Sequence, residues 1–153
     1  GRRLTRQAKR RELNMYQIGG PFLTTAVFCE EERQQEGFLS LFRIIDRIAV
    51  VGIGPVMPPT QLEMTLVVIF RSGSFRGRNT INLTQWSPSG FPLPLFDFPV
   101  FFQGGEQGAG VIAKVGFAVQ EIGLHWFQIS LGGQPVTNIP LTIVYQPTGG
   151  VTA

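Results

Sequence analysis

An alternation of apolar and polar residues with a period of two recurs along the chain from Phe22 onwards, and it constrains the fold more than any other feature. It is clearest at residues 79–86, where Thr and Asn alternate with Ile and Leu. Successive side chains of a β-strand point to opposite faces, so this pattern predicts strands with one buried face. Strands are expected at residues 22–29, 39–51, 62–70, 79–86, 95–102, 111–120, 123–131 and 135–144.

The segments between these strands are rich in Gly, Pro or charged residues, which is typical of turns and loops. Many short strands with frequent turn signals and no helices between them favour a sandwich over alternating βα units. We therefore predict an immunoglobulin-like antiparallel β-sandwich of about seven to nine strands. Loops are expected at residues 30–37, 52–59, 72–78, 87–94 and 104–110, and the last strand is expected to be broken near Pro140.

The length of 153 residues fits one domain with a sizeable core. We divide the chain into a basic N-terminal extension at residues 1–20, a sandwich at 21–147 and a tail at 148–153. Residues 4–15 contain good helix formers, so the extension is a candidate for a short helix. Six of the 13 Lys and Arg residues lie in the extension, before Glu12. The rest of the chain contains seven Lys and Arg residues and all ten Asp and Glu residues. The body of the protein is therefore mildly acidic.

Cys29 is the single cysteine, so no disulfide can form within the chain. The absence of disulfides favours a reducing compartment. The basic start is not followed by the apolar region of a signal peptide, and no apolar run approaches the roughly 20 residues that span a bilayer. We expect a cytoplasmic protein without membrane contact.

Two segments carry a resemblance to known sequences. Residues 38–48 read FLSLFRIIDRI after a strand and a short acidic segment, and residues 121–133 read EIGLHWFQISLGG. With Ile139-Pro140-Leu141, these segments resemble an uncharacterised family of small bacterial all-β proteins, in which a Phe-Asp-Arg-Ile-like strand precedes a late Gly-x-Tyr-x-Phe-like strand. His125 stands where that family tends to have Tyr. The resemblance implies the fold and a usual start near Met15, and it implies no activity.

The residues that carry most enzyme chemistry are scarce in this chain. His125 is the only histidine, and on a strand it shares a face with Phe127, which indicates a core position. One His and one Cys do not supply the three or four ligands of a zinc site. The Glu residues that follow Cys29 disfavour its thiolate. We therefore expect no catalytic residue, no metal and no cofactor.

Other polar features leave alternatives open. Asp46 and Arg47 are adjacent, so on a strand they point to opposite faces and do not pair directly. They form a possible polar site, either as a structural carboxylate or a charge pair with a neighbouring strand, or as a polar contact at a binding site. An enzyme that uses carboxylates such as Asp46 or Glu63 is a third hypothesis for the function. The Gly-rich segment 104–110 is not a phosphate-binding loop, because a strand rather than a helix is expected to follow it.

The basic extension is the candidate for nucleic-acid contact, which is the second hypothesis. Lys and Arg residues that neutralise phosphates bind nucleic acid in a salt-dependent way. The extension has no aromatic residue before Tyr16, and the body that follows is acidic. The residues concerned are Arg2, Arg3, Arg6, Lys9, Arg10 and Arg11.

The most unusual stretch is the Phe- and Pro-rich segment 91–102. Proline cannot donate to a central ladder, so this segment is expected to be an edge or irregular strand. It is apolar on both faces, and one sandwich cannot bury both faces of an edge strand. Two alternatives follow: a partner covers the excess apolar surface, or the segment is a core strand whose outer face is covered by the N-terminal segment or a loop. We therefore predict a non-catalytic binding or assembly module, a homo-oligomer or a partner of another protein. The predicted protein-binding residues are Phe91, Leu93, Leu95, Phe96, Phe98 and Phe101.

Overall fold

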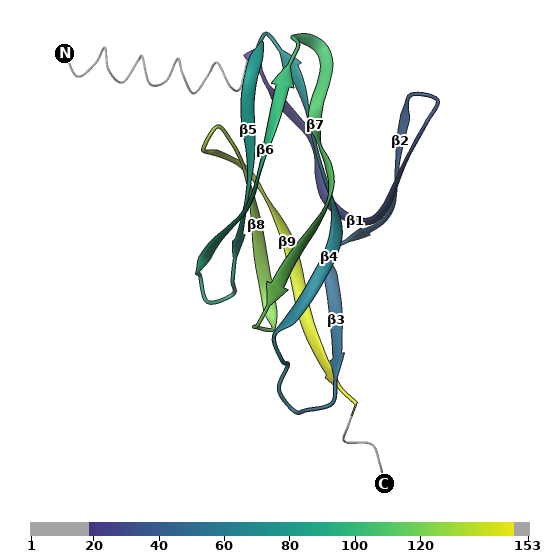
Figure 1. The fold of residues 1–153 in the computed structure, drawn as a ribbon, viewed down its shortest axis with the longest axis vertical. Helices are drawn as coiled ribbons and strands as arrows, with labels where there is room; N and C mark the ends of the chain where they lie inside the picture. Colours follow the sequence, from purple (N-terminus) through teal and green to yellow (C-terminus); the bar gives the residue numbers. More distant parts are fainter. Residues whose placement is uncertain (1–18, 149–153) are drawn as a thin grey trace, which may run out of the picture.

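The computed structural model describes residues 19–148, which form two β-sheets packed face to face (Figure 1). The four-stranded sheet has the order β2-β1-β4-β7, and the five-stranded sheet has the order β3-β9-β8-β5-β6. This arrangement confirms the predicted all-β sandwich, and there is no helix among the described residues. The strands are β1 (Phe22–Gln35), β2 (Phe38–Ile45), β3 (Arg47–Gly52), β4 (Thr60–Gly73), β5 (Gly77–Trp86), β6 (Pro92–Phe102), β7 (Gly105–Val119), β8 (Gly123–Leu131) and β9 (Gln134–Pro147).

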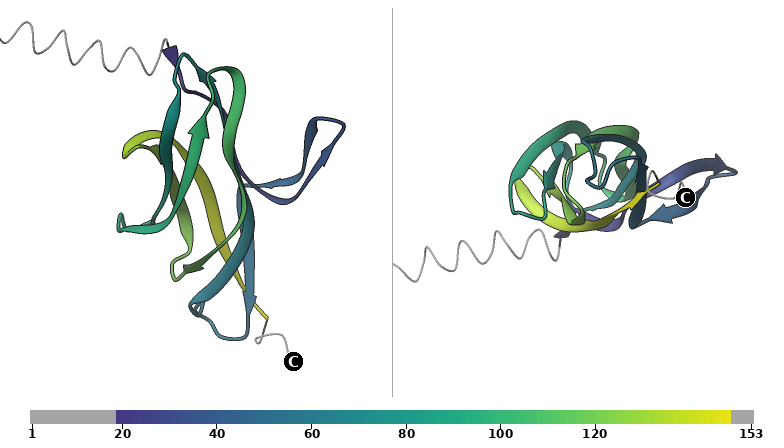
Figure 2. Two further views of the ribbon diagram at one scale, coloured as in Figure 1. Left: turned by 45° about the horizontal axis from the view of Figure 1, so that its top comes forward. Right: turned by 90° about the horizontal axis from the view of Figure 1, so that it is seen from below.

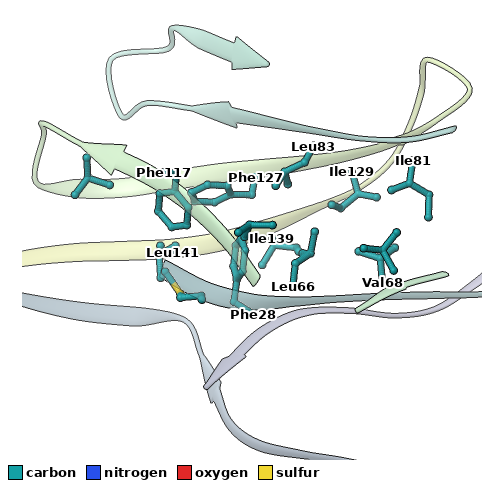
Figure 3. Close-up of a cluster of buried hydrophobic side chains, with 14 of the residues drawn as sticks. Phe28, Leu66, Val68, Ile81, Leu83, Phe117, Phe127, Ile129, Ile139 and Leu141 are labelled. Atoms are coloured by element: carbon teal, nitrogen blue, oxygen red, sulfur yellow. The ribbon is translucent and has the colours of Figure 1, made fainter. Parts of the chain in front are cut away.

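The core lies between the inner faces of the two sheets (Figure 3). Its centre is a group of three aromatic rings from three strands. The centroid of the Phe127 ring lies 4.6 Å from that of Phe117 and 4.9 Å from that of Phe28, the latter in an edge-to-face arrangement. Offset or edge-to-face packing of this kind adds to the free energy of apolar burial. Aliphatic side chains from β4, β5, β8 and β9 complete the core, among them Leu66, Val68, Ile81, Leu83, Ile129, Ile139 and Leu141.

The predicted single strand at residues 39–51 is divided at Asp46. Its first half is β2 in the four-stranded sheet, and its second half is β3 in the five-stranded sheet. There β3 pairs with β9 in parallel, which is the one parallel pair between the described strands. An apolar run has the same pattern in either sheet, so the sequence did not show where the chain crosses.

All five segments predicted as turns or loops contain strand residues, and in three of them the strand part is three residues or more at one end. Residues 30–35 continue β1, and only Glu36 and Gly37, both at positive φ, form the turn to β2. β6 begins at Pro92, inside the predicted turn, and β7 begins at Gly105, inside the predicted loop. A side chain at Gly110 would collide with the backbone of Val68, so glycine here permits the close pairing of β7 with β4.

The predicted break near Pro140 is also wrong, because β9 runs through it. At this position β9 has a paired strand on one side only, where Pro140 lies opposite Trp126. The pairing with β3 begins at Thr142. The missing N–H of the proline therefore leaves no ladder bond unmade.

Candidate functional site

A hairpin arm extends away from the body of the sandwich (Figures 1 and 2). It consists of the second half of β1 and of β2 up to Ile44. The pairing of β1 with β4 ends at Cys29 opposite Thr65, whereas the pairing with β2 continues to Gln35 opposite Phe38. Beyond Cys29, β1 therefore has one neighbouring strand instead of two. We call the ribbon of residues 30–44 the arm.

The β2 side of the arm is apolar on both faces. Phe38, Phe42 and Ile44 lie on one face with exposed fractions of 76%, 42% and 61%. Leu39 and Leu41 lie on the other face and are half-buried. A two-stranded ribbon in water is at best marginally stable and has no second layer with which to cover such side chains. The arm therefore carries apolar surface that the sandwich itself does not bury.

The β1 side of the arm is charged. Glu31 lies opposite Phe42, and the guanidinium of Arg33 lies 4.9 Å from the centre of the Phe42 ring. Arg33 also pairs with Glu31 at 3.3 Å between Nε and Oε1. Exposed ion pairs and cation–π contacts are worth at most about 1 kcal/mol each. They hold the Arg33 side chain over one face of the arm and leave most of the Phe38 side chain uncovered.

The arm bends near Arg43. This residue has a φ of 52° and lies between two regular pairs of the β1–β2 ladder, at Cys29–Ile44 and Glu31–Phe42. A non-glycine residue in the left-handed region is uncommon, and it interrupts the regular pleat here. The Arg43 guanidinium lies 3.3 Å from the carboxylate of Glu30 on the opposite strand. The bend re-aims the arm away from the sandwich.

An open hollow of about 320 Å³ lies where the arm leaves the sheet, lined by Glu30 to Glu32 of β1 and by residues of β4 and β7, including Lys114. Beside it, burial raises the pKa of the Cys29 thiol, and the nearby Glu32 carboxylate raises it further. The direction predicted for Cys29 is thus confirmed, and the thiol is buried in a structural position. Among the described residues, no group of three or more His, Cys, Asp or Glu side chains could hold a metal ion.

The second free edge with apolar surface is β6, as predicted. Phe91, next to it in the β5–β6 turn, is 72% exposed, and Leu93, Phe96 and Phe101 are also exposed. Leu95 and Phe98 are half-buried and pack against the core. The predicted protein-binding residues thus divide into four that face solvent and two that stabilise the sandwich.

Prolines change what the β6 edge can do. Pro92, Pro94 and Pro99 lie opposite Trp86, Thr84 and Thr80, which are alternate residues of β5. The register shift after Leu83 keeps all three prolines in phase. Since proline has no N–H, it fits positions whose nitrogen points away from the neighbouring strand. The prolines therefore remove donors that β6 would offer to an additional strand, a common protection of edge strands.

The other predicted site residues do not form a site together. Asp46 and Arg47 are exposed at the crossing between the sheets, and neither side chain forms a hydrogen bond or ion pair within residues 19–148. Nε2 of the buried His125 donates a hydrogen bond of 2.9 Å to the carbonyl oxygen of Glu121. The exposed Glu63 lies on β4.

The basic cluster of the extension, Arg2 to Arg11, lies outside the described residues, and so does its expected helix. The described part of the chain has no helix long and apolar enough to cross a bilayer.

The sequence reasoning missed the arm. Its signals are an acidic run of strand-compatible residues, a Glu-Gly turn and a second strand that is apolar at every position but two, Ser40 and Arg43. The acidic run was assigned to a loop because charge is more frequent in loops, although the Glu-Gly pair supplies a two-residue hairpin turn.

Comparison with known proteins adds no assignment: the chain matches no protein-family model, and no curated protein matches it.

Proposed function

We propose that the protein is a non-catalytic assembly module that associates with a second copy of itself through the arm. The observation that carries the proposal is the composition of β2, a free edge strand with apolar side chains on both faces and no proline. Such an edge offers backbone donors and acceptors to another strand, and strand addition also covers the apolar side chains beside it.

The charges near the free edge of β2 are compatible with the addition of β2 from a second copy. Arg43 is the one charged residue of β2, and the Glu residues of β1 lie on the far side of β2 from any added strand. When two copies of β2 pair antiparallel about a two-fold axis, residues that lie opposite each other share a face of the sheet. The residue nearest the axis therefore lies opposite the same residue of the other copy. With Leu41 or Phe42 at the centre, Arg43 lies opposite Leu39 or Leu41, respectively. Neither register brings like charges together.

The test uses two phenylalanines with nearly equal exposure, Phe38 on the arm and Phe91 beside β6. We expect the full chain to sediment as a concentration-dependent dimer. Phe38→Asp introduces a charge into the apolar contact and is expected to weaken the dimer at least tenfold, about 1.4 kcal/mol. Phe91→Asp is the matched control and is expected to leave the association unchanged. Circular dichroism checks that both variants are folded.

A strictly monomeric full chain at all concentrations would overturn the proposal. A dimer that Phe91→Asp dissociates and Phe38→Asp does not would instead assign the contact to the β6 surface. A dimer that dissociates in high salt and on removal of residues 1–14, but not with Phe38→Asp, would assign it to the basic extension.

A further inference from the structure

The outer face of the five-stranded sheet carries both tryptophans of the chain in one row. Trp86 of β5 lies directly opposite Trp126 of β8. On the two outer sides of this pair, Pro92 lies opposite Trp86 and Pro140 lies opposite Trp126. The neighbouring residues along the same strands, such as Phe127, point into the core, so this row faces away from it.

The two indoles present apolar surface to solvent. Trp126 is 42% exposed and Trp86 is half-buried. Nε1 of Trp86 donates a hydrogen bond of 3.1 Å to Oε1 of Gln128, two residues along β8 from Trp126. This bond fixes the orientation of the Trp86 ring and occupies the acceptor of Gln128. The Gln128 amide nitrogen has no partner among the described residues.

A second row beside the tryptophans consists of uncharged hydrogen-bonding groups. Thr84 lies opposite Gln128, and Gln128 lies opposite Asn138 of β9. The hydroxyl of Thr84 and the amide of Asn138 form no hydrogen bond within residues 19–148. Together they offer donors and acceptors next to the indoles. Neither row contains a charged side chain.

Charge therefore limits the ligand. Asp97 is the nearest carboxylate along the next row, and it already accepts a hydrogen bond of 2.7 Å from Asn82. Arg47 of β3 lies opposite Thr142 of β9, outside both rows. A phosphate, an acidic peptide or a cationic ligand would find no opposite charge on the two rows. The face matches an uncharged ligand with one apolar face and hydroxyl groups at its rim.

We propose that this face binds a neutral oligosaccharide. The C–H face of a pyranose ring packs on an indole. Its hydroxyl groups both donate and accept, as the amide nitrogen of Gln128 and the amide of Asn138 require. Two adjacent tryptophans provide for two consecutive sugar rings. The proposal does not depend on self-association, because the arm belongs to the other sheet.

The test exploits the fact that the chain has only these two tryptophans. Tryptophan fluorescence and the two indole N–H resonances therefore report on this face alone. We expect cellohexaose or maltohexaose to shift both resonances in a saturable way. Trp126→Ala is expected to raise the Kd about tenfold or more, as for aromatic residues at the centre of binding sites.

Asn138→Ala is the second variant, because it removes an exposed side chain that has no hydrogen-bond partner within residues 19–148 and is not part of the core. We expect it to raise the Kd severalfold, whereas Phe91→Ala, off the two rows, leaves the Kd unchanged. The proposal is overturned if neither oligosaccharide shifts the indole resonances, if binding survives Trp126→Ala, or if a proline-rich peptide shifts them and the oligosaccharides do not.

Discussion

The two apolar free edges of this protein, β2 and β6, differ in what their backbones offer. β6 carries three prolines in phase along one side, and its inward side chains extend the core of the sandwich. β2 carries no proline, and most of it stands outside the sandwich on the arm. Exposed phenylalanines occur beside both edges, so side-chain exposure alone does not distinguish them. The two edges differ in the availability of backbone N–H donors, which a partner strand requires.

The largest expected effect comes from reopening the β6 edge. In the Phe38→Asp background, which removes the proposed β2 contact, Pro94→Thr together with Pro99→Thr restores two backbone N–H groups that point away from β5. We expect the double variant to associate strongly, with a concentration-dependent rise in light scattering. Pro55→Thr, in the exposed loop before β4, is the control. If the double variant scatters no more than Phe38→Asp alone, prolines are not what protects β6.

A smaller effect is expected from relieving the bend of the arm. Arg43→Gly removes the cost of a side chain at a φ of 52°. The left-handed conformation costs a non-glycine residue about 1–2 kcal/mol, and the greater unfolded-state entropy of glycine offsets roughly half of this. We expect a gain of about 0.5 kcal/mol in the free energy of unfolding in urea.

The control for this substitution is Glu30→Gln, which breaks the exposed ion pair with Arg43 and leaves the backbone unchanged. We expect it to alter stability by less than about 0.5 kcal/mol. Destabilisation by Arg43→Gly of more than about 1 kcal/mol would show that the Arg43 side chain, and not its backbone, holds the bend.

The smallest effect concerns the base of the arm. Burial and the Glu32 carboxylate raise the pKa of the Cys29 thiol. Glu32→Gln removes the charge and is expected to lower this pKa while leaving it above that of a free cysteine, because burial is the larger cause. The ultraviolet absorbance of the single thiolate during a pH titration measures it. Glu36→Gln, at the tip of the arm, is expected to change nothing.

The raised pKa of the Cys29 thiol also predicts how the stability of the protein depends on pH. Because the folded-state pKa of Cys29 is raised, the stability that the protonated thiol contributes is present at pH values below the unfolded pKa and is lost as pH rises through the folded pKa. Urea unfolding of wild type and Cys29→Ala at increasing alkaline pH measures this: the loss is expected in wild type only.

The alternation of apolar residues identified most strands, because in a sheet with one buried face the side-chain period follows directly from the pleat. β8 was predicted with its observed bounds, and the prolines of β6 predicted an edge or irregular strand, which is an edge strand in the structure. The incorrect predictions lie in segments whose composition is compatible with both a loop and a strand. Residues 30–35 are charged as in a loop but pair as a strand, and residues 105–110 are rich in glycine as in a loop but lie close against β4.

The sequence by itself determined the fold class, the exclusion of β6 from a central position and the buried position of Cys29, since each depends on residue type and local spacing. Only the tertiary structure decided that the chain crosses between sheets at Asp46, that an arm stands outside the sandwich, and that Trp86 lies beside Trp126. These features depend on which strands become neighbours. Strand neighbours are fixed by packing between distant segments, which no local pattern of residues specifies.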